Sequence, residues 1–234
     1  MRRRARRLGD RLAGTRDRCD RRAPACDGIC DAVVHNAQVT TWQWLGRAEF
    51  RSVLADQLAA RERVWAGEPG VVLLCEHAPV ITLGRSATPA HIVDPGDTPV
   101  ERIERGGEVT YHGPGQLMIY PVVRVRSVVG FLERVAAAIA DTCAALGAPG
   151  AAWRRDPAGV WLGDHKLAAC GIHVARGVSV HGFALDVATP SAAWRKIRPC
   201  GLSVPQISLA RARGSEITVD AVAAELGPRV AQAV

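Results

Sequence analysis

One cysteine stands in a sequence setting typical of a reactive nucleophile. Cys200 lies between Pro199 and Gly201. Proline and glycine interrupt helices and strand ladders, so the thiol is expected at a sharp turn, where an exposed nucleophile can meet a substrate. The alternative is a thiol that packs inside a loop, because free cysteines are often buried small side chains.

A lysine at the start of an apolar run is the second candidate for chemistry. Lys166 precedes the run LAACGIHV, and such a lysine is usually a solvated cation at a strand end. The functional alternative is an amine removed from water, whose lowered pKa lets it accept a proton. The composition favours this alternative, because 28 of the 30 basic residues are Arg and only Lys166 and Lys196 are Lys. A guanidinium does not release its proton, so a position that must do so retains lysine.

Glycine and proline are concentrated in residues 105–116, RGGEVTYHGPGQ. Glycines at this density let the backbone approach a ligand and expose N–H groups to it. Neither GxGxxG nor GK[ST] opens a helix here, so the segment matches neither a dinucleotide fingerprint nor a phosphate loop. A tight hairpin whose turns require glycine is the alternative. His112 and His181 are candidate orienting or proton-donating groups, or else hydrogen-bonded core histidines.

The positive charge of the chain is concentrated at its beginning. Residues 1–30 contain ten Arg and four Asp, which give +6 of the net charge of +7, so the remaining 204 residues sum to +1. A basic body that binds nucleic acid is therefore not expected. We expect residues 1–30 to form an Arg-rich disordered tail and residues 31–234 to form a single domain.

Hydropathy and cysteine usage limit the cellular setting. The chain has no apolar run long enough to cross a bilayer, and the initial MRRRARR is not followed by an apolar segment. We therefore expect neither membrane attachment nor a secretory signal, and a cytoplasmic protein. Its seven cysteines include no CxxC pair, so neither a metal site nor disulfides are expected.

Helical and strand patterns mix along the chain without a strict alternation. This mixture predicts an α+β fold with a mixed β-sheet and flanking helices. The predicted helices cover 46–66, 127–146 and 218–233, with a helical turn at 191–197 and an interruption of the last helix near Gly227-Pro228. The predicted strands cover 71–75, 80–84, 108–111 and 116–125, then a meander of 159–162, 166–176 and 178–188.

Five motifs in this order resemble the octanoyltransferase family, also called lipoate-protein ligase B. They are EHAPVITLGR (76–85), RGGEVTYHGPGQLMIYP (105–121), GVWL with HKLAACGIHV (159–174), HGFALDV (181–187) and IRPCGL (197–202). The resemblance spans about residues 45–210 and implies the fold of the biotin and lipoate ligase catalytic domain. It also implies transfer of an octanoyl group from octanoyl-acyl carrier protein to a lysine of a lipoyl domain, without a cofactor.

The resemblance assigns roles to individual residues. It implies that Cys200 is the nucleophile that carries the acyl group as a thioester and that Lys166 is its catalytic partner. Leu167 and Ala169 are expected as walls of an apolar pocket. The residues implied to bind substrate are Arg105, Gly106, Gly107, Glu108, Val109, Thr110, Tyr111, His112, Gly171, Ile172, His181, Gly182 and Phe183. Two positions depart from the family pattern, which usually has Asn at Asp186 and Ile at Cys170.

The implied acceptors are the lipoyl domains of 2-oxo acid dehydrogenases and the glycine cleavage H protein. A local basic patch of Arg102, Arg105, Arg195 and Arg198 is a hypothesis for docking the acidic carrier proteins. The chain is expected to act as a monomer, with no nucleic-acid partner.

Other functions stay open from the sequence. An ATP-dependent lipoate or octanoate ligase, or a carrier-to-carrier amidotransferase of the same fold, is the main alternative. The ligases do not need a cysteine at the turn, so the Pro-Cys-Gly motif argues against them. A non-catalytic module that binds nucleic acid through its Arg-rich tail is a third possibility, opposed by the nearly neutral body.

Overall fold

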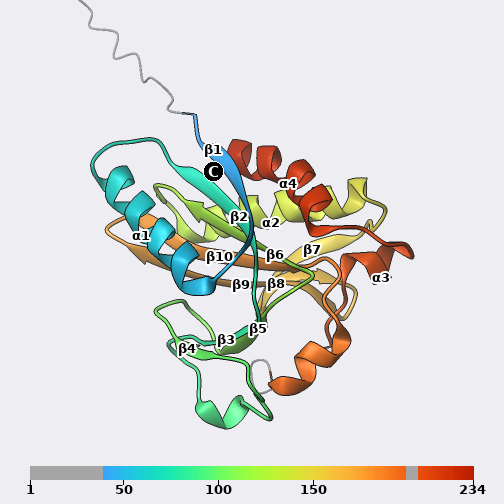
Figure 1. Cartoon of the computed structure of the whole chain (residues 1–234). Helices are drawn as coiled ribbons and strands as arrows, with labels where there is room; N and C mark the ends of the chain where they lie inside the picture. Colours follow the sequence, from blue (N-terminus) through green and yellow to red (C-terminus); the bar gives the residue numbers. More distant parts are fainter. Residues whose placement is uncertain (1–38, 199–204) are drawn as a thin grey trace, which may run out of the picture. The chain divides into compact units, whose positions relative to one another are not determined.

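A seven-stranded mixed sheet is the centre of the fold, in a computed structural model that describes residues 39–198 and 205–234. The strand order is β1-β2-β6-β10-β9-β8-β7 (Figure 1). Only β1 and β2 run parallel, and all other neighbours in this sheet are antiparallel. The strands are β1 Thr41–Ala48, β2 Val71–His77, β6 Gln116–Val122, β7 Ala151–Arg155, β8 Ala158–Leu162, β9 His165–Ala175 and β10 Val178–Asp186.

A smaller sheet of three strands carries part of the glycine-rich segment. Its order is β4 (Val100–Arg102), β3 (Val80–Leu83) and β5 (Val109–His112). The strands before and after the break at residues 113–115 therefore belong to different sheets, since β5 pairs with β3 whereas β6 pairs with β2 and β10. The hairpin alternative for this segment is thus wrong, and the glycines serve the passage of the chain from one sheet to the other.

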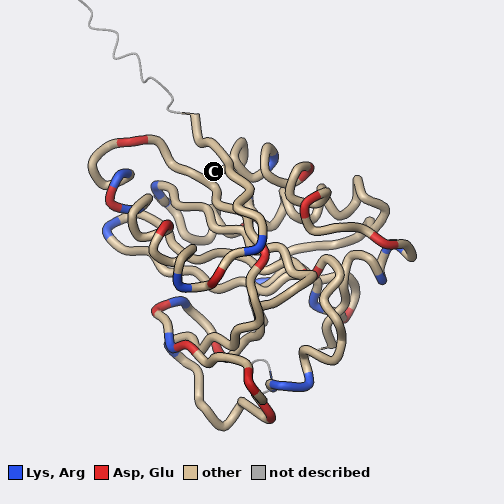
Figure 2. The backbone as a smooth tube through the Cα atoms, in the orientation of Figure 1, with Lys and Arg blue, Asp and Glu red and all other residues tan. Residues whose placement is uncertain are grey.

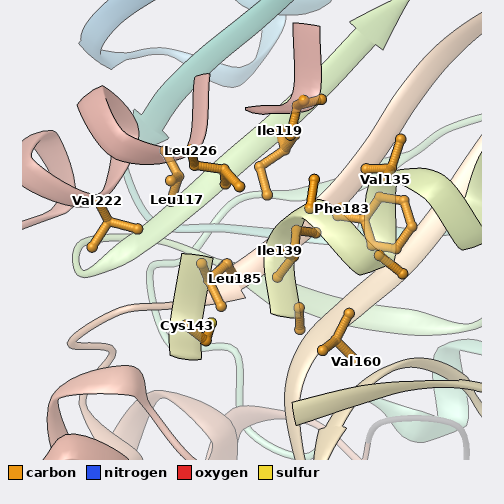
Figure 3. Close-up of a cluster of buried hydrophobic side chains, with 14 of the residues drawn as sticks. Leu117, Ile119, Val135, Ile139, Cys143, Val160, Phe183, Leu185, Val222 and Leu226 are labelled. Carbon is orange, nitrogen blue, oxygen red and sulfur yellow. The ribbon is translucent and has the colours of Figure 1, made fainter. Parts of the chain in front are cut away.

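Helices cover both faces of the main sheet. On one face, α2 (Val128–Ala145) and α4 (Val219–Ala233) pack against the central strands and form the larger core. Figure 3 shows how Val135, Ile139 and Cys143 of α2 meet side chains of β6, β8, β10 and α4 there. On the opposite face, α1 (Phe50–Trp65) packs mainly against β10, β6 and β2.

The mixed sheet with flanking helices confirms the predicted α+β class. The expected helices at α1, α2 and α4 and the strands of the meander are present, and the helical turn 191–197 is the 3-10 helix η2, Ser191–Lys196. The sequence patterns did not reveal several short or exposed elements. These are β1, β4, β7, the 3-10 helix η1 (Pro89–His91) and α3 (Leu209–Arg213).

The predicted interruption of the last helix is wrong. Helix α4 continues through Pro228 to Ala233. A proline inside a helix removes one backbone hydrogen bond, but Leu226 and Val230 are fully buried in the larger core and hold the helix on the sheet. Gly227 lies against the ring of Trp42, where a Cβ atom would come within 2.5 Å of ring carbons. The glycine therefore permits close packing of helix on sheet.

Charges of both signs are interspersed on the periphery of the described residues. Figure 2 shows Lys and Arg together with Asp and Glu along the helices and loops, while the central strands are largely free of both. In the described ranges, no helix combines the length and the apolar character that a bilayer crossing requires.

Candidate active site

A cavity of about 140 Å³ lies on the face of the main sheet that α1 covers in part. Its floor is built from small residues on two neighbouring strands. Ala169 and Gly171 of β9 lie directly opposite Ala184 and Gly182 of β10. Four larger side chains here would fill the space above the sheet, so the sequence of small residues on alternate positions creates the cavity.

A β-bulge turns Lys166 into this cavity. Strict alternation along β9 would place Lys166 on the opposite face from Ala169, three residues away. The pairing with β8 shifts, however, because Val160 lies opposite Ala168 whereas Trp161 lies opposite Lys166. One extra residue, Leu167, is inserted in β9, and Lys166 lines the cavity.

Lys166 is 5 % exposed, and its side chain packs against defined neighbours. Its Nζ lies 5.0 Å from the centre of the Trp161 ring. Gly159 lies beneath the stem, where a Cβ atom would be 3.2 Å from Lys166 Cε and 2.5 Å from the Ala168 carbonyl oxygen. The Lys166 backbone N–H donates to the carbonyl oxygen of Pro205, the first described residue after Cys200. Cys200 itself lies outside the described residues.

Arg105 fixes the glycine-rich segment that forms another wall. Its Nη2 donates to the Thr82 carbonyl oxygen at 2.8 Å and to the Glu108 carbonyl oxygen at 2.7 Å, and its Nη1 donates to the Gly106 carbonyl oxygen at 3.0 Å. Gly84 permits this approach, since a Cβ atom there would be 2.2 Å from the Gly107 carbonyl oxygen. Arg105 is 7 % exposed, so it is not available to the surface patch that the sequence suggested.

Two histidines at the cavity are held neutral. Burial and the nearby Arg105 cation together lower the pKa of His112 to about 3 and that of His181 to about 4, and burial is the larger cause for both. His112 Nδ1 lies 2.7 Å from Gln116 Oε1, and its Nε2 lies 3.3 Å from Thr82 Oγ1. Near pH 7 both imidazoles therefore act as neutral hydrogen-bonding groups.

A local break in the β6–β10 ladder directs His181. Pro121 of β6 has no backbone N–H that could donate to β10. Its carbonyl oxygen accepts a hydrogen bond from Ser179 Oγ. The His181 backbone has φ +60°, a left-handed conformation uncommon for a residue with a side chain, and its N–H donates to Gln57 Oε1 of α1 at 2.7 Å. The next residue, Gly182, has no room for a side chain, because a Cβ atom there would lie 1.9 Å from the Ile119 carbonyl oxygen.

Most residues selected from the sequence surround the cavity. The lining includes Lys166, Arg105, Gly107, Glu108, Val109, Thr110, His112, Gly171, His181, Gly182 and Phe183. Gly106, Tyr111 and Ile172 are not part of it. Gly106 instead donates its N–H to the Ile172 carbonyl oxygen, and the buried Tyr111 ring packs edge-on against Trp194.

Two expectations about side-chain direction need correction. Phe183 borders the cavity, but its ring is 1 % exposed and lies in the larger core 6.1 Å from Trp153, because it alternates with Gly182 and Ala184. Leu167 also lies in that core, as the extra residue of the bulge, whereas Ala169 does line the cavity.

Sequence reasoning missed several lining residues. They are Phe50, Ile103, Met118, Tyr120, Ala158, Ala184, Trp194 and Gln206. Alternation along β10 would have revealed Ala184, which lies two residues from Gly182 and therefore on the same face. The others belong to segments from which no substrate-binding residue was selected. Among the described residues, no group of three His, Cys, Asp or Glu is arranged to hold a metal ion.

The family of the chain follows from comparison with known proteins. The sequence model of the family described as the lipoyl protein ligase A/B catalytic domain matches residues 50–230 of this chain. This range includes the cavity, Lys166 and the segment around Cys200. The chain belongs to this family. Curated relatives include proteins named octanoyltransferase from Gloeobacter violaceus, 40 % identical over 73 % of this chain and 74 % of its own length, and from Geobacter sp. strain M21, 40 % identical over 75 % and 86 %.

Solved structures that include a lipoate-protein ligase have the same fold. Lipoate-protein ligase A bound with ATP superposes with a TM-score of 0.72 over 83 % of this chain and 85 % of its own, at 14 % identity. A T. acidophilum protein with bound lipoic acid gives a TM-score of 0.68 over 83 % of this chain and 86 % of its own, also at 14 % identity. These similarities confirm the predicted ligase-like fold.

Proposed function

We propose that this protein transfers an octanoyl group to a lysine of lipoyl domains. The observation that carries the proposal is the small-residue cavity with a buried lysine, in a chain 40 % identical to proteins named octanoyltransferase. The apolar floor suits an alkyl chain, because burial of each methylene group contributes about 0.8 kcal/mol. Lys166 supplies the one amine of the described cavity lining for proton transfer.

The proposed reaction has two steps. The Cys200 thiolate attacks the thioester carbonyl of octanoyl-acyl carrier protein, a new thioester forms on Cys200, and the carrier leaves as a thiol that regains the proton. The amine of the acceptor lysine then attacks this thioester, an amide forms, and the Cys200 sulfur leaves. Neutral Lys166 accepts the proton lost by the attacking amine. Because the donor thioester is already activated, the reaction consumes no ATP.

The proposal includes a setting for the reaction. The donor is octanoyl-acyl carrier protein, and the acceptors are lipoyl domains of 2-oxo acid dehydrogenases and the glycine cleavage H protein. Residues 31–234 act as one monomeric domain, and residues 1–30 are an appended tail. A nucleophilic thiol requires a reducing compartment, which supports a cytoplasmic location.

The acyl-enzyme step is tested by intact-mass measurement and peptide mapping after incubation with octanoyl-acyl carrier protein. We expect one octanoyl group on Cys200, which disappears when a lipoyl domain is added. Cys200→Ala should show no adduct and no transfer. Cys143→Ala is the matched control, because Cys143 lies in the larger core outside the cavity lining, and burial raises the pKa of its thiol to about 12 and keeps it protonated.

The outcomes separate the candidate functions. Transfer without any adduct on Cys200 would show direct attack by the acceptor and contradict the thioester intermediate. ATP-dependent turnover of free octanoate that survives Cys200→Ala would instead establish a ligase.

The cavity floor predicts a change in acyl selectivity. Ala184, which is 3 % exposed, lies between Ala169 and Met118 on the floor. In Ala184→Leu the larger side chain occupies space needed by the octanoyl chain, so kcat/KM for octanoyl donors should fall by about 10- to 100-fold. A butanoyl donor measured with the same variant is the internal control. An equal loss with both donors would indicate a general folding defect and contradict a role in chain-length selection.

A further inference from the structure

A continuous chain of buried hydrogen bonds connects the two sheets beside the cavity. Arg105 donates from Nε and Nη2 to Thr82 Oγ1 at 3.2 and 2.9 Å. Thr82 Oγ1 lies 3.3 Å from His112 Nε2, and His112 Nδ1 lies 2.7 Å from Gln116 Oε1. Gln116 Nε2 donates to Asp186 Oδ1 at 2.9 Å. All five side chains are at most 7 % exposed.

Arg105 and Asp186, at the two ends of this series of hydrogen bonds, determine which group donates and which accepts in each bond. A guanidinium only donates hydrogen bonds, and an ionised carboxylate only accepts them. With Asp186 ionised, the Gln116 amide must turn its NH₂ group to the carboxylate and its oxygen to His112. The hydrogen on His112 must then reside on Nδ1, which leaves the Nε2 lone pair for the Thr82 hydroxyl hydrogen. Thr82 Oγ1 is already an acceptor for Arg105, so its own hydrogen is available for this bond.

We infer that Asp186 is a positioning residue that acts through Gln116 to hold the neutral imidazole of His112 in its Nδ1–H form, with the Nε2 lone pair on the side of Thr82. A histidine that lines the substrate cavity thereby has one fixed pattern of donor and acceptor. This inference deepens the proposed acyl transfer and rests on it for its catalytic meaning. The hydrogen-bonding arrangement itself is independent of any substrate.

The surroundings of the His112 imidazole and of the Asp186 carboxyl agree with this assignment. Arg105, His77 and His181 face His112 from the loop before β5, from β2 and from β10. Burial is the largest cause that lowers the pKa of His112, and the positive charge of Arg105 acts in the same direction, so the imidazole stays neutral. Burial raises the pKa of Asp186 to about 7, against the lowering effect of hydrogen bonds from Gln116 and Thr189. Asp186 is therefore ionised above about pH 7, where the direction of the chain is imposed most strongly.

Nitrogen chemical shifts of ¹⁵N-labelled histidine rings measure the tautomer directly. At a pH above about 8, where the carboxylate is ionised, we expect wild-type His112 to carry its hydrogen on Nδ1. Thr82→Val removes the hydroxyl group that donates to His112 Nε2. The tautomer should stay unchanged, since Asp186, acting through Gln116, still fixes it. Thr82→Val combined with Asp186→Asn should populate both tautomers, because an asparagine amide can donate or accept.

His77 provides an internal reference in the same spectra. Its Nδ1 lies 2.8 Å from the Ala48 carbonyl oxygen, which only accepts, so His77 should stay in the Nδ1–H form in every variant. Assignment of the His112 signal comes from its loss in His112→Gln. The rate of transfer in the double variant should also fall by about 10- to 100-fold, as expected for a displaced hydrogen-bonding group at a reacting centre.

The inference is overturned by an Nε2–H tautomer in wild-type protein, or by loss of the Nδ1–H form in Thr82→Val alone. A double variant that retains a pure Nδ1–H form also overturns it. The wild-type spectrum decides even where a variant does not fold. If the expected tautomers appear but wild-type protein transfers no octanoyl group, the proposed function fails while the positioning by Asp186 stands.

Discussion

Replacement of Lys166 by methionine should lower the rate of octanoyl transfer by about 10²- to 10⁴-fold, the usual contribution of a positioned acid or base. Methionine retains the length and apolar stem that fill the space above Gly159, but it has no amine to accept the proton of the attacking lysine. Lys166→Arg should fail to a similar degree, because a guanidinium keeps its proton near neutral pH. The loss should appear mainly in the second step.

A single-turnover measurement isolates that step. Enzyme already loaded with octanoyl on Cys200 is mixed with a lipoyl domain, and the decay of the adduct is followed by mass spectrometry. Lys196→Arg is the matched control, since Lys196 Nζ donates to the Pro95 carbonyl oxygen outside the cavity and the variant should transfer at the wild-type rate. Decay within a few-fold of wild type in Lys166→Met would contradict the role of Lys166.

The sequence predicted Lys166 as a candidate but not the way in which the fold presents it. Its residue type, its place before an apolar run and the scarcity of lysine all pointed to it. Regular alternation, however, would have turned it away from Ala169. Only the bulge at Leu167 brings both to one cavity, and a bulge depends on the pairing of two strands, which no local pattern records.

Long periodic segments were predictable for the same reason that short ones were not. The apolar faces of α1 and α2 repeat over several turns, whereas β1 is a half-exposed edge strand, and β4 has three residues. The hydrogen-bond chain that ends at Asp186 was also beyond local patterns. Its members come from three separate parts of the sequence, β3, residues 105–116 and β10. The departure of Asp186 from the family pattern was the single signal that this position has unusual surroundings.

Asp186 also predicts a pH-dependent difference in stability between the wild-type protein and Asp186→Asn. The folded protein holds the carboxyl pKa at about 7, above its ordinary value of 3.8, because the carboxylate is buried. The folded state thus binds this proton more tightly than the unfolded state. Its contribution to stability is fully present below about pH 4 and is lost as the pH rises through about 7. Over this interval wild-type protein should lose up to about 4 kcal/mol of unfolding free energy that Asp186→Asn, which has no charge to bury, retains.

Urea unfolding of both proteins at several values between about pH 4 and pH 8 measures this difference. The neutral buried histidines His112 and His181 have lowered pKa values, so their contribution is lost as the pH falls, with the opposite sign. They are present in both proteins and cancel in the difference. Asp164→Asn is the control, because the Asp164 side chain is 98 % exposed and its replacement should give a difference independent of pH. A difference that is independent of pH for Asp186→Asn as well would mean that the pKa of the Asp186 carboxyl is not raised in the folded protein. The direction of the hydrogen bonds at His112 would then not depend on pH in this range.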